Sequence, residues 1–192
     1  MNSLLKKIES EIKTRNISNG YISDILSENK HLTNRRIIMG YASVAMVDRE
    51  NQKISIDALR EAVKRFMQQD KYRLISIFHS DAVVGRVLPK WTDPKTGKVY
   101  KNEVDDVGWK IIVELREDIE LAQKVWDEIV KGNLRSFSVA GTAKQKSEHS
   151  ENGKSYTQID ELDLLEVTVC SVPVNPMSMF QIAWQGENQV YI

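Results

Sequence analysis

Apolar residues recur at alternate positions in several short runs of this chain, a pattern that predicts β-strands with one buried face. The first run, residues 36–48, is rich in Ile, Val and Tyr. The final run is stopped by Pro173 and Pro176, because proline cannot donate to a strand ladder. The other runs read as strands are residues 74–78, 83–88, 109–115, 134–140 and 156–159, and the final one is 164–174.

Two segments have the 3.6-residue spacing of amphipathic helices, residues 57–69 and 118–131. Asp57 is expected to cap the first, and Gly132 stands where a helix-ending glycine belongs in the second. The side chains expected to face the core are Leu59, Val63, Phe66 and Met67 in the first helix and Ala122, Val125, Trp126, Ile129 and Val130 in the second.

The polar segments between these elements indicate turns and set the fold class. Residues 93–98 have the composition of a turn that joins Trp91 to Val99, and residues 144–155 are expected to form a mobile loop or hairpin tip. The helices do not alternate regularly with the strands, which disfavours a doubly wound parallel sheet. We therefore predict an α+β fold, mainly an antiparallel β-barrel or curled sheet with peripheral helices.

Three regions differ in pattern along the chain. Residues 1–34 hold one short amphipathic helix, about residues 3–15, followed by scattered isoleucines among Asn, Ser and Gly. We interpret residues 1–34 as an arm outside the main fold, residues 35–183 as the globular domain and residues 184–192 as a C-terminal tail.

Composition excludes several classes of protein. The 192 residues include 27 basic and 27 acidic ones, a net charge of +0, whereas a general nucleic-acid binder needs an excess of cations. The single cysteine, Cys170, excludes a disulfide scaffold and fits a reducing compartment. No stretch approaches the roughly 20 apolar residues that span a bilayer, and no signal-peptide pattern is visible, so we expect an intracellular protein with no membrane association.

Among the three histidines, His79 is the candidate for proton transfer. His31 lies in the polar arm and His149 in the polar segment 144–155, where both are expected to be solvated. His79 follows the apolar run Leu-Ile-Ser-Ile-Phe, which anchors its backbone at a strand end and leaves its imidazole free. A neutral imidazole is the side chain best suited to accept a proton near pH 7.

Ser138 is the candidate nucleophile, because a hydroxyl on a rigid strand becomes reactive once a nearby base takes its proton. Period-2 alternation places Ser136, Ser138 and Ala140 on one strand face, so Ser136 competes for the role. Gly141, a short step along the strand, is expected to let backbone amides turn toward an oxyanion.

A carboxylate inside a strand needs a partner, and Glu166 sits in the alternating run Leu-Leu-Glu-Val-Thr-Val-Cys. Leu165, Val167 and Val169 are expected on the apolar face, and Glu166, Thr168 and Cys170 on the opposite one. From that face Glu166 can stabilise a protonated imidazole. Asp163 is the alternative. Cys170 is a weaker candidate nucleophile, since no local cation or helix N-terminus lowers its pKa. The pattern contains no metal-ligand spacing and no phosphate loop, so neither metal nor cofactor is expected.

Four segments in this order resemble a known family. They are Gly-Tyr-Ala-Ser (40–43), His79 followed by Val-Gly-Arg-Val (84–87), Lys-Gly-Asn-Leu-Arg-Ser-Phe-Ser-Val-Ala-Gly (131–141), and Leu-Leu-Glu-Val-Thr-Val (164–169) closed by Pro-Val-Asn-Pro (173–176). Over about residues 36–179 the chain resembles the prohead maturation serine proteases of tailed phages, which are similar in fold to the herpesvirus assemblins.

The resemblance implies a serine endopeptidase that cleaves scaffold and major capsid proteins inside the assembling procapsid, in the host cytoplasm, without a cofactor or nucleic acid. It implies His79 as general base, Ser138 as nucleophile and Glu166 in the place of the second assemblin histidine. For this mechanism the expected oxyanion donors are backbone amides near Val139, Ala140 and Gly141, together with Arg86 or Arg135.

The same resemblance leads us to expect a homodimer, because assemblins depend on dimerisation. The separate pattern of residues 1–34 leads us to expect an arm that either binds assembly partners or is removed by self-cleavage. The alternative is a catalytically silent capsid-assembly or scaffold-binding module on the same fold. The presence of all three candidate catalytic residues favours the enzyme.

Overall fold

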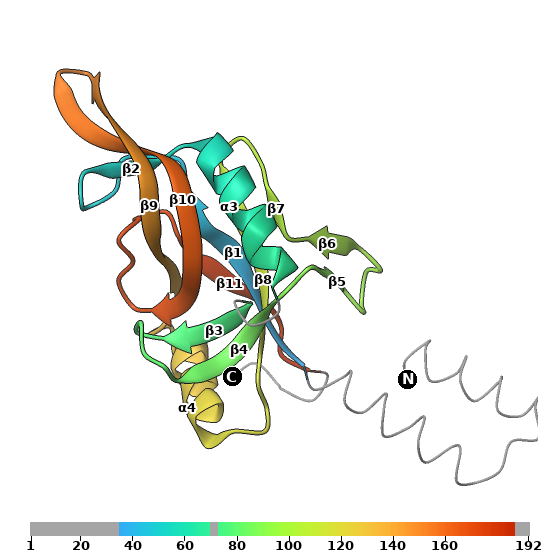
Figure 1. The fold of residues 1–192 in the computed structure, drawn as a ribbon. Coiled ribbons are helices and arrows are strands. Elements are labelled where there is room, and N and C mark those ends of the chain that lie inside the picture. Colours follow the sequence, from blue (N-terminus) through green and yellow to red (C-terminus); the bar gives the residue numbers. More distant parts are fainter. Residues whose placement is uncertain (1–34, 70–72, 187–192) are drawn as a thin grey trace, which may run out of the picture. The chain divides into compact units, whose positions relative to one another are not determined.

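The computed structural model describes residues 35–69 and 73–186. The expected helix at residues 3–15, the rest of the arm, His31 and residues 187–192 lie outside the described residues. Every helix and strand described below belongs to one compact unit, Arg36–Gln185 (Figure 1). The division into arm, domain and tail stays a prediction.

Strands make up most of this unit, and two helices accompany them. In chain order the elements are β1 (Arg36–Val44), β2 (Gln52–Ile54), α3 (Ile56–Gln68), β3 (Leu74–Ile77), β4 (Val83–Leu88), β5 (Lys90–Thr92), β6 (Val99–Lys101), β7 (Glu103–Val104), β8 (Gly108–Leu115), α4 (Glu120–Val130), β9 (Ser136–Glu151), β10 (Lys154–Cys170) and β11 (Phe180–Trp184).

The main sheet has the strand order β11-β1-β8-β4-β3-β10-β2, with β7 added on β8 and β9 added on β10. Its described strands do not close into a ring, so the barrel, one of the two predicted forms of the sheet, is wrong. The predicted mixture of mainly strands with two helices is confirmed. The sheet is also not purely antiparallel, because β10 runs parallel to both β2 and β3.

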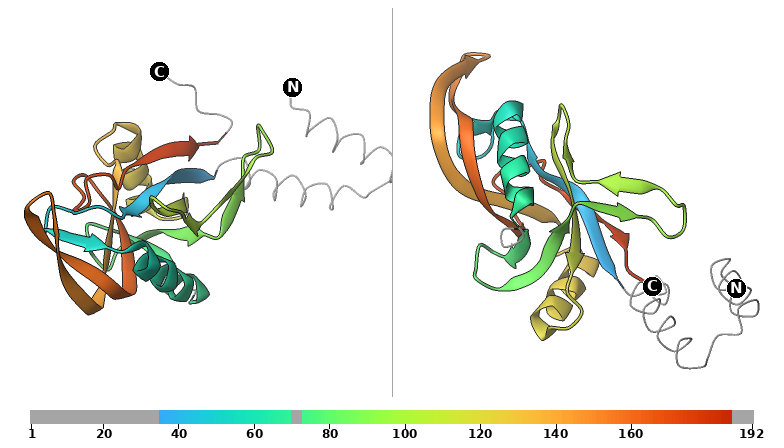
Figure 2. Two further views of the ribbon diagram at one scale, coloured as in Figure 1. Left: turned by 90° about the horizontal axis from the view of Figure 1, so that it is seen from above. Right: turned by 45° about the vertical axis from the view of Figure 1, so that its right-hand side comes forward.

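The parallel pairs arise from the crossover β2–α3–β3. The helix carries the chain from one side of β10 to the other, so that β2 and β3 run in the same direction with β10 between them. Strands joined in this way are parallel because the helix returns the chain to the end where it started. Figure 2 shows α3 lying alongside the β9–β10 hairpin.

Both predicted helices form, with corrections at their ends. Ser55, and not Asp57, caps α3: its hydroxyl accepts a hydrogen bond from the Ala58 N–H at 3.2 Å. Gly132 follows α4 with a φ of +78°, which confirms the predicted helix-ending glycine. Val130 was expected to face the core but is 53% exposed, because the apolar stripe of α4 ends at Ile129.

Of the two alternatives predicted for residues 144–155, a mobile loop or a hairpin tip, the structure confirms the hairpin tip: the segment is the end of a long hairpin. β9 and β10 pair over nearly their whole length and turn at Asn152–Gly153, both with positive φ. Asn-Gly is the preferred sequence for such a two-residue turn, so the signal was present. Polar residues extend along β9 because most of its outer half is exposed to water, whereas Tyr156 and Ile159 of β10 are buried.

The core lies between the sheet and the helices and holds the candidate strands in place. Phe66 of α3 meets Trp109 of β8 edge to face, with ring centroids 5.5 Å apart, and both side chains are at most 1% exposed. Val167 and Val169 of β10 and Phe137 of β9 are fully buried in the same cluster. The strands that carry Ser138 and Glu166 are therefore rigidly packed.

Candidate active site

Three hydroxyl side chains form a row across three neighbouring strands. Thr168 of β10 is the register partner of Ser76 of β3 on one side and of Ser138 of β9 on the other. Directly paired residues on adjacent strands present their side chains on the same face of a sheet. All three are buried, with Ser76 and Ser138 6% exposed and Thr168 0% exposed.

His79 lies in a tight turn that contacts this row at Thr168. Phe78 and His79 have φ values of +52° and +55°, and the Ser80 N–H donates to the Ile77 carbonyl at 3.1 Å. Two central residues with positive φ define a type I′ turn, which glycine and asparagine adopt more readily than phenylalanine or histidine. Left-handed backbone at non-glycine residues costs roughly 1–2 kcal/mol each, so the surrounding contacts must stabilise this turn.

Strand β10 supplies those contacts. The Phe78 N–H donates to the Val169 carbonyl at 3.2 Å, and the His79 N–H donates to Thr168 Oγ1 at 3.1 Å. The backbone of His79 is therefore fixed to the residue that stands next to Ser138 in the sheet.

Glu166 lies against the imidazole of His79, with 3.0 Å between Oε2 and Nδ1. Its other oxygen, Oε1, accepts a hydrogen bond from the Ser76 hydroxyl. An ionised carboxylate only accepts, so this contact with a neutral imidazole requires the proton on Nδ1 and leaves Nε2 as the acceptor. The His79 and Glu166 side chains are 42% and 28% exposed.

A β-bulge directly before Glu166 corrects one expectation about this strand. Leu164 pairs with Gly141 and Glu166 with Ala140, so that Leu165 is the extra residue and is 48% exposed. The bulge breaks the strict alternation that placed Leu165 on the buried face. Glu166 and Thr168 nonetheless share a face, as predicted.

His79, Ser138 and Glu166 all line one cleft of about 570 Å³, together with the Val139–Gly141 segment. Within the described residues, the Ser138 hydroxyl has no hydrogen-bond partner, and no hydrogen bond joins it to the His79 ring. Catalytic hydrogen bonds in unliganded enzymes are often long and tighten on substrate binding. Residues of several other segments also line the cleft, among them Ala42, Ser43, Met46, Asp48, Glu50, Gln52, Ile54, Val174, Asn175 and Ser178.

The remaining predicted site residues divide into those at the cleft and those elsewhere. Val139, Ala140 and Gly141 reach it, but Gly141 lies inside β9 rather than at a turn, and an added Cβ there would come within 2.3 Å of the Asp163 carbonyl oxygen. Arg86 does not line the cleft and donates from Nε and Nη2 to Glu114 at 3.1 and 2.8 Å.

The alternative candidates for the catalytic roles, Asp163, Ser136 and Cys170, do not line the cleft. Asp163 forms ion pairs with Arg65 at 3.6 Å and with Lys144 at 3.1 Å, away from His79. Ser136 is fully buried and its hydroxyl contacts the Met179 sulfur at 3.2 Å. Burial raises the pKa of the Cys170 thiol, which disfavours the thiolate that nucleophilic attack requires.

Sequence reasoning did not single out Ser76, and it noted Thr168 only by its strand face. The available signal at Ser76 was a hydroxyl inside the apolar run Leu-Ile-Ser-Ile, since a buried hydroxyl needs a hydrogen-bond partner. The partner itself was not visible, because Glu166 is distant in sequence.

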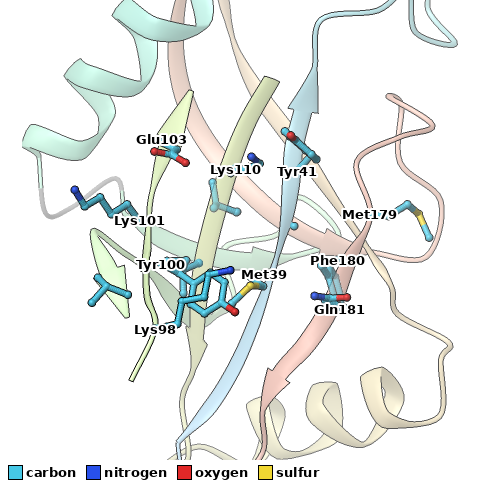
Figure 3. A pocket seen from close by; sticks show the side chains of 14 residues that line it. Met39, Tyr41, Lys98, Tyr100, Lys101, Glu103, Lys110, Met179, Phe180 and Gln181 are labelled. Atoms are coloured by element: carbon cyan, nitrogen blue, oxygen red, sulfur yellow. The ribbon is translucent and has the colours of Figure 1, made fainter. Parts of the chain in front are cut away.

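A second cavity, of about 650 Å³, lies between the β5–β6 hairpin and strands β1, β8 and β11. Figure 3 shows Lys98, Tyr100 and Met39 gathered at its centre, with Lys110 and Tyr41 side by side at one end. None of the three candidate catalytic residues lines it. Across the described residues, no group of three or more His, Cys, Asp or Glu side chains is arranged to hold a metal ion.

A hydroxyl, an imidazole and a carboxylate that line one cleft are the three groups used by serine hydrolases. The family model described as caudovirus prohead serine protease matches residues 24–190, and the chain belongs to that family. No curated protein matches the chain.

Membership of this family implies a serine peptidase with a role in phage capsid maturation. The match begins at residue 24, inside the segment interpreted as an arm. Among the described helices, neither is long and apolar enough to cross a membrane.

Proposed function

We propose that this protein is a serine endopeptidase that cleaves scaffold and major capsid proteins during procapsid maturation, with Ser138 as nucleophile, His79 as general base and Glu166 as the residue that orients His79. The observation that carries the proposal is the contact between Glu166 Oε2 and His79 Nδ1 in a cleft that Ser138 also lines. Membership of the prohead protease family supports the reaction class.

The roles follow from the protonation states. Glu166 holds the proton on Nδ1, so Nε2 accepts the proton of Ser138 as Oγ bonds to the carbonyl carbon of the scissile peptide. His79 then gives this proton to the amine nitrogen as the C–N bond breaks. A water molecule, activated in the same way by His79, hydrolyses the acyl-enzyme and restores Ser138.

Charge develops on the carbonyl oxygen in each of these steps and requires donors. We assign this role to backbone amides of Val139–Gly141, which border the cleft beside Ser138. Loss of one such donor typically costs about 3 kcal/mol in the activation barrier. Arg86, which is bonded to Glu114, is left out of the assignment.

A fluorophosphonate probe tests the nucleophile without knowledge of the cleavage sequence. Ser138 Oγ attacks phosphorus, fluoride leaves, and His79 accepts the hydroxyl proton, so the probe reports activation of the serine. We expect covalent labelling of the peptide that contains Ser138, detected by mass spectrometry, and its loss in Ser138→Ala and His79→Ala. Labelling that survives in Ser138→Ala would overturn the assignment.

The substrates are tested by incubation with purified scaffold and capsid precursor proteins of the same phage. Cleavage by the wild type that disappears in Ser138→Ala supports the endopeptidase. Tight binding to intact precursor, with neither cleavage nor probe labelling, supports the silent assembly module instead.

The proposed function also covers the arm, residues 1–34, and the oligomeric state. We propose that the arm either holds the enzyme on its assembly partners or is removed by the enzyme itself, and that the active form is a homodimer. Intact-mass measurement of wild type and Ser138→Ala tests self-cleavage, since full-length masses for both proteins, differing only by the substituted oxygen atom, would exclude it. Sedimentation analysis tests the dimer.

A further inference from the structure

Two of the three members of the hydroxyl row, Ser76 and Thr168, have no role in the proposed reaction. Each makes a hydrogen bond to one half of the Glu166–His79 pair. Ser76 donates to Glu166 Oε1, and Thr168 Oγ1 accepts from the His79 backbone N–H at 3.1 Å. The two residues are register partners on parallel strands, so they present their side chains side by side.

We propose that Ser76 and Thr168 are positioning residues, with Ser76 setting the orientation of the Glu166 carboxylate and Thr168 fixing the backbone of His79. This inference rests on the proposed function of the same cleft. It adds two residues that touch neither substrate nor the reacting atoms and act only through Glu166 and His79.

Ser76 acts on the carboxylate of Glu166. A bond at Oε2 alone leaves the carboxylate free to rotate about its last torsion angle, whereas bonds at both oxygens fix its plane. Ser76 supplies the second bond from a buried strand, and its side chain makes no other hydrogen bond among the described residues. Its hydroxyl is therefore aimed at Glu166 alone.

Thr168 acts on the turn that holds Phe78 and His79. His79 has a φ of +55°, and Phe78 before it has a φ of +52°, so the turn is costly and needs anchors. Thr168 anchors it from the strand position next to Ser138, roughly one strand spacing of about 5 Å away. The same residue thus sets the distance between the base and the nucleophile.

Fluorophosphonate kinetics on the full chain test this inference. We expect Ser76→Ala and Thr168→Val to lower the rate constant of inactivation about tenfold or more while the probe's binding constant stays unchanged, since each removes one hydrogen bond to the catalytic pair. Ser76→Thr and Thr168→Ser keep the hydroxyl and are expected to restore labelling to near the wild-type rate.

Ser136→Ala is the matched control. Ser136 is an equally buried hydroxyl on β9, but it contacts Met179 and does not line the cleft. Its loss is expected to leave labelling unchanged, and thermal melting of all variants separates a folding defect from a defect in positioning. Wild-type labelling rates in both Ser76→Ala and Thr168→Val would overturn the inference.

A spectroscopic readout separates this inference from the proposed function. In Ser138→Ala, which cannot react, proton NMR is expected to show a downfield His79 Nδ1–H resonance from the bond to Glu166, identified by its loss in His79→Gln. Adding Ser76→Ala or Thr168→Val is expected to shift or broaden it. If the wild type is never labelled at Ser138, the proposed function fails. An absent or unshifted resonance overturns the positioning roles separately.

Discussion

At the scale of single residues, the site depends on contacts between side chains that are far apart in sequence. Glu166 lies 3.0 Å from His79 and also accepts from Ser76, so its two oxygens face two different elements. The alternation of its strand predicted correctly that Glu166 shares a face with Thr168. It did not predict the bulge that exposes Leu165, because bulges depend on the partner strand.

Glu166→Gln tests the role of the carboxylate. An amide favours the wrong tautomer of His79 and no longer stabilises the imidazolium, so we expect the labelling rate of Ser138 to fall by roughly 10³–10⁴-fold. Circular dichroism is expected to show an unchanged fold, since Gln has nearly the shape of Glu. A loss of less than tenfold would contradict the assignment of Glu166 as the third member.

Cys170 provides the test of the thiol alternative. Burial raises the pKa of its thiol and the side chain is 6% exposed, so iodoacetamide at neutral pH is expected to leave native protein unmodified. Denatured protein is expected to react fully. Unchanged labelling of Ser138 in Cys170→Ala would exclude Cys170 as the nucleophile. Loss of labelling in this variant would support the thiol alternative instead.

At the scale of elements, the β9–β10 hairpin carries Ser138 and Glu166 on its two strands. Two glycines of this hairpin serve different purposes. Gly153 supplies a φ of +76° at the tip, with nothing within 4 Å of an added Cβ. Gly141 lies in the strand, where the Asp163 carbonyl leaves no room for a side chain. Of the two glycines, only Gly141 lines the cleft.

Gly141→Ala and Gly153→Ala therefore form a matched pair. A Cβ at Gly141 would stand 2.3 Å from the Asp163 oxygen and must displace β10 just before Glu166, so we expect loss of labelling at Ser138 and a lowered melting temperature. Gly153→Ala is expected to cost about 1–2 kcal/mol of stability and to leave labelling unchanged. Equal effects on labelling would contradict this view of the hairpin.

At the scale of the whole molecule, Asp105 ties β1 to the β7–β8 turn. Its carboxylate accepts from the Tyr41 hydroxyl at 2.8 Å, from Lys110 at 2.6 Å and from the Val107 and Gly108 N–H groups at 2.9 Å. Partial burial alone would raise the pKa of Asp105, but these hydrogen bonds outweigh it and hold the pKa well below its usual value. Figure 3 shows Tyr41 and Lys110 lying together.

Asp105→Asn is expected to lower the free energy of unfolding at pH 7 by about 2 kcal/mol, roughly one charged hydrogen bond. A carboxylate with a lowered folded-state pKa stabilises the protein above its ordinary pKa of about 4, and this contribution is lost as the pH falls toward the folded-state value. Urea titrations at several pH values are expected to show the two proteins converging below about pH 4. A gap that stays constant with pH would refute the assignment.

Local patterns in the sequence determined the parts of this protein that local physics controls: both helices, most strands, the glycine after α4, and the candidates His79, Ser138 and Glu166. Tertiary structure alone decided that the sheet stays open and that β10 lies parallel to β2 and β3, because strand partners are chosen by packing between distant segments. It also decided that Glu166 rather than Asp163 contacts His79, and that Ser76 and Thr168 form hydrogen bonds to Glu166 and His79. Periodicity assigns a side chain to a face, but only the register between strands assigns it a neighbour.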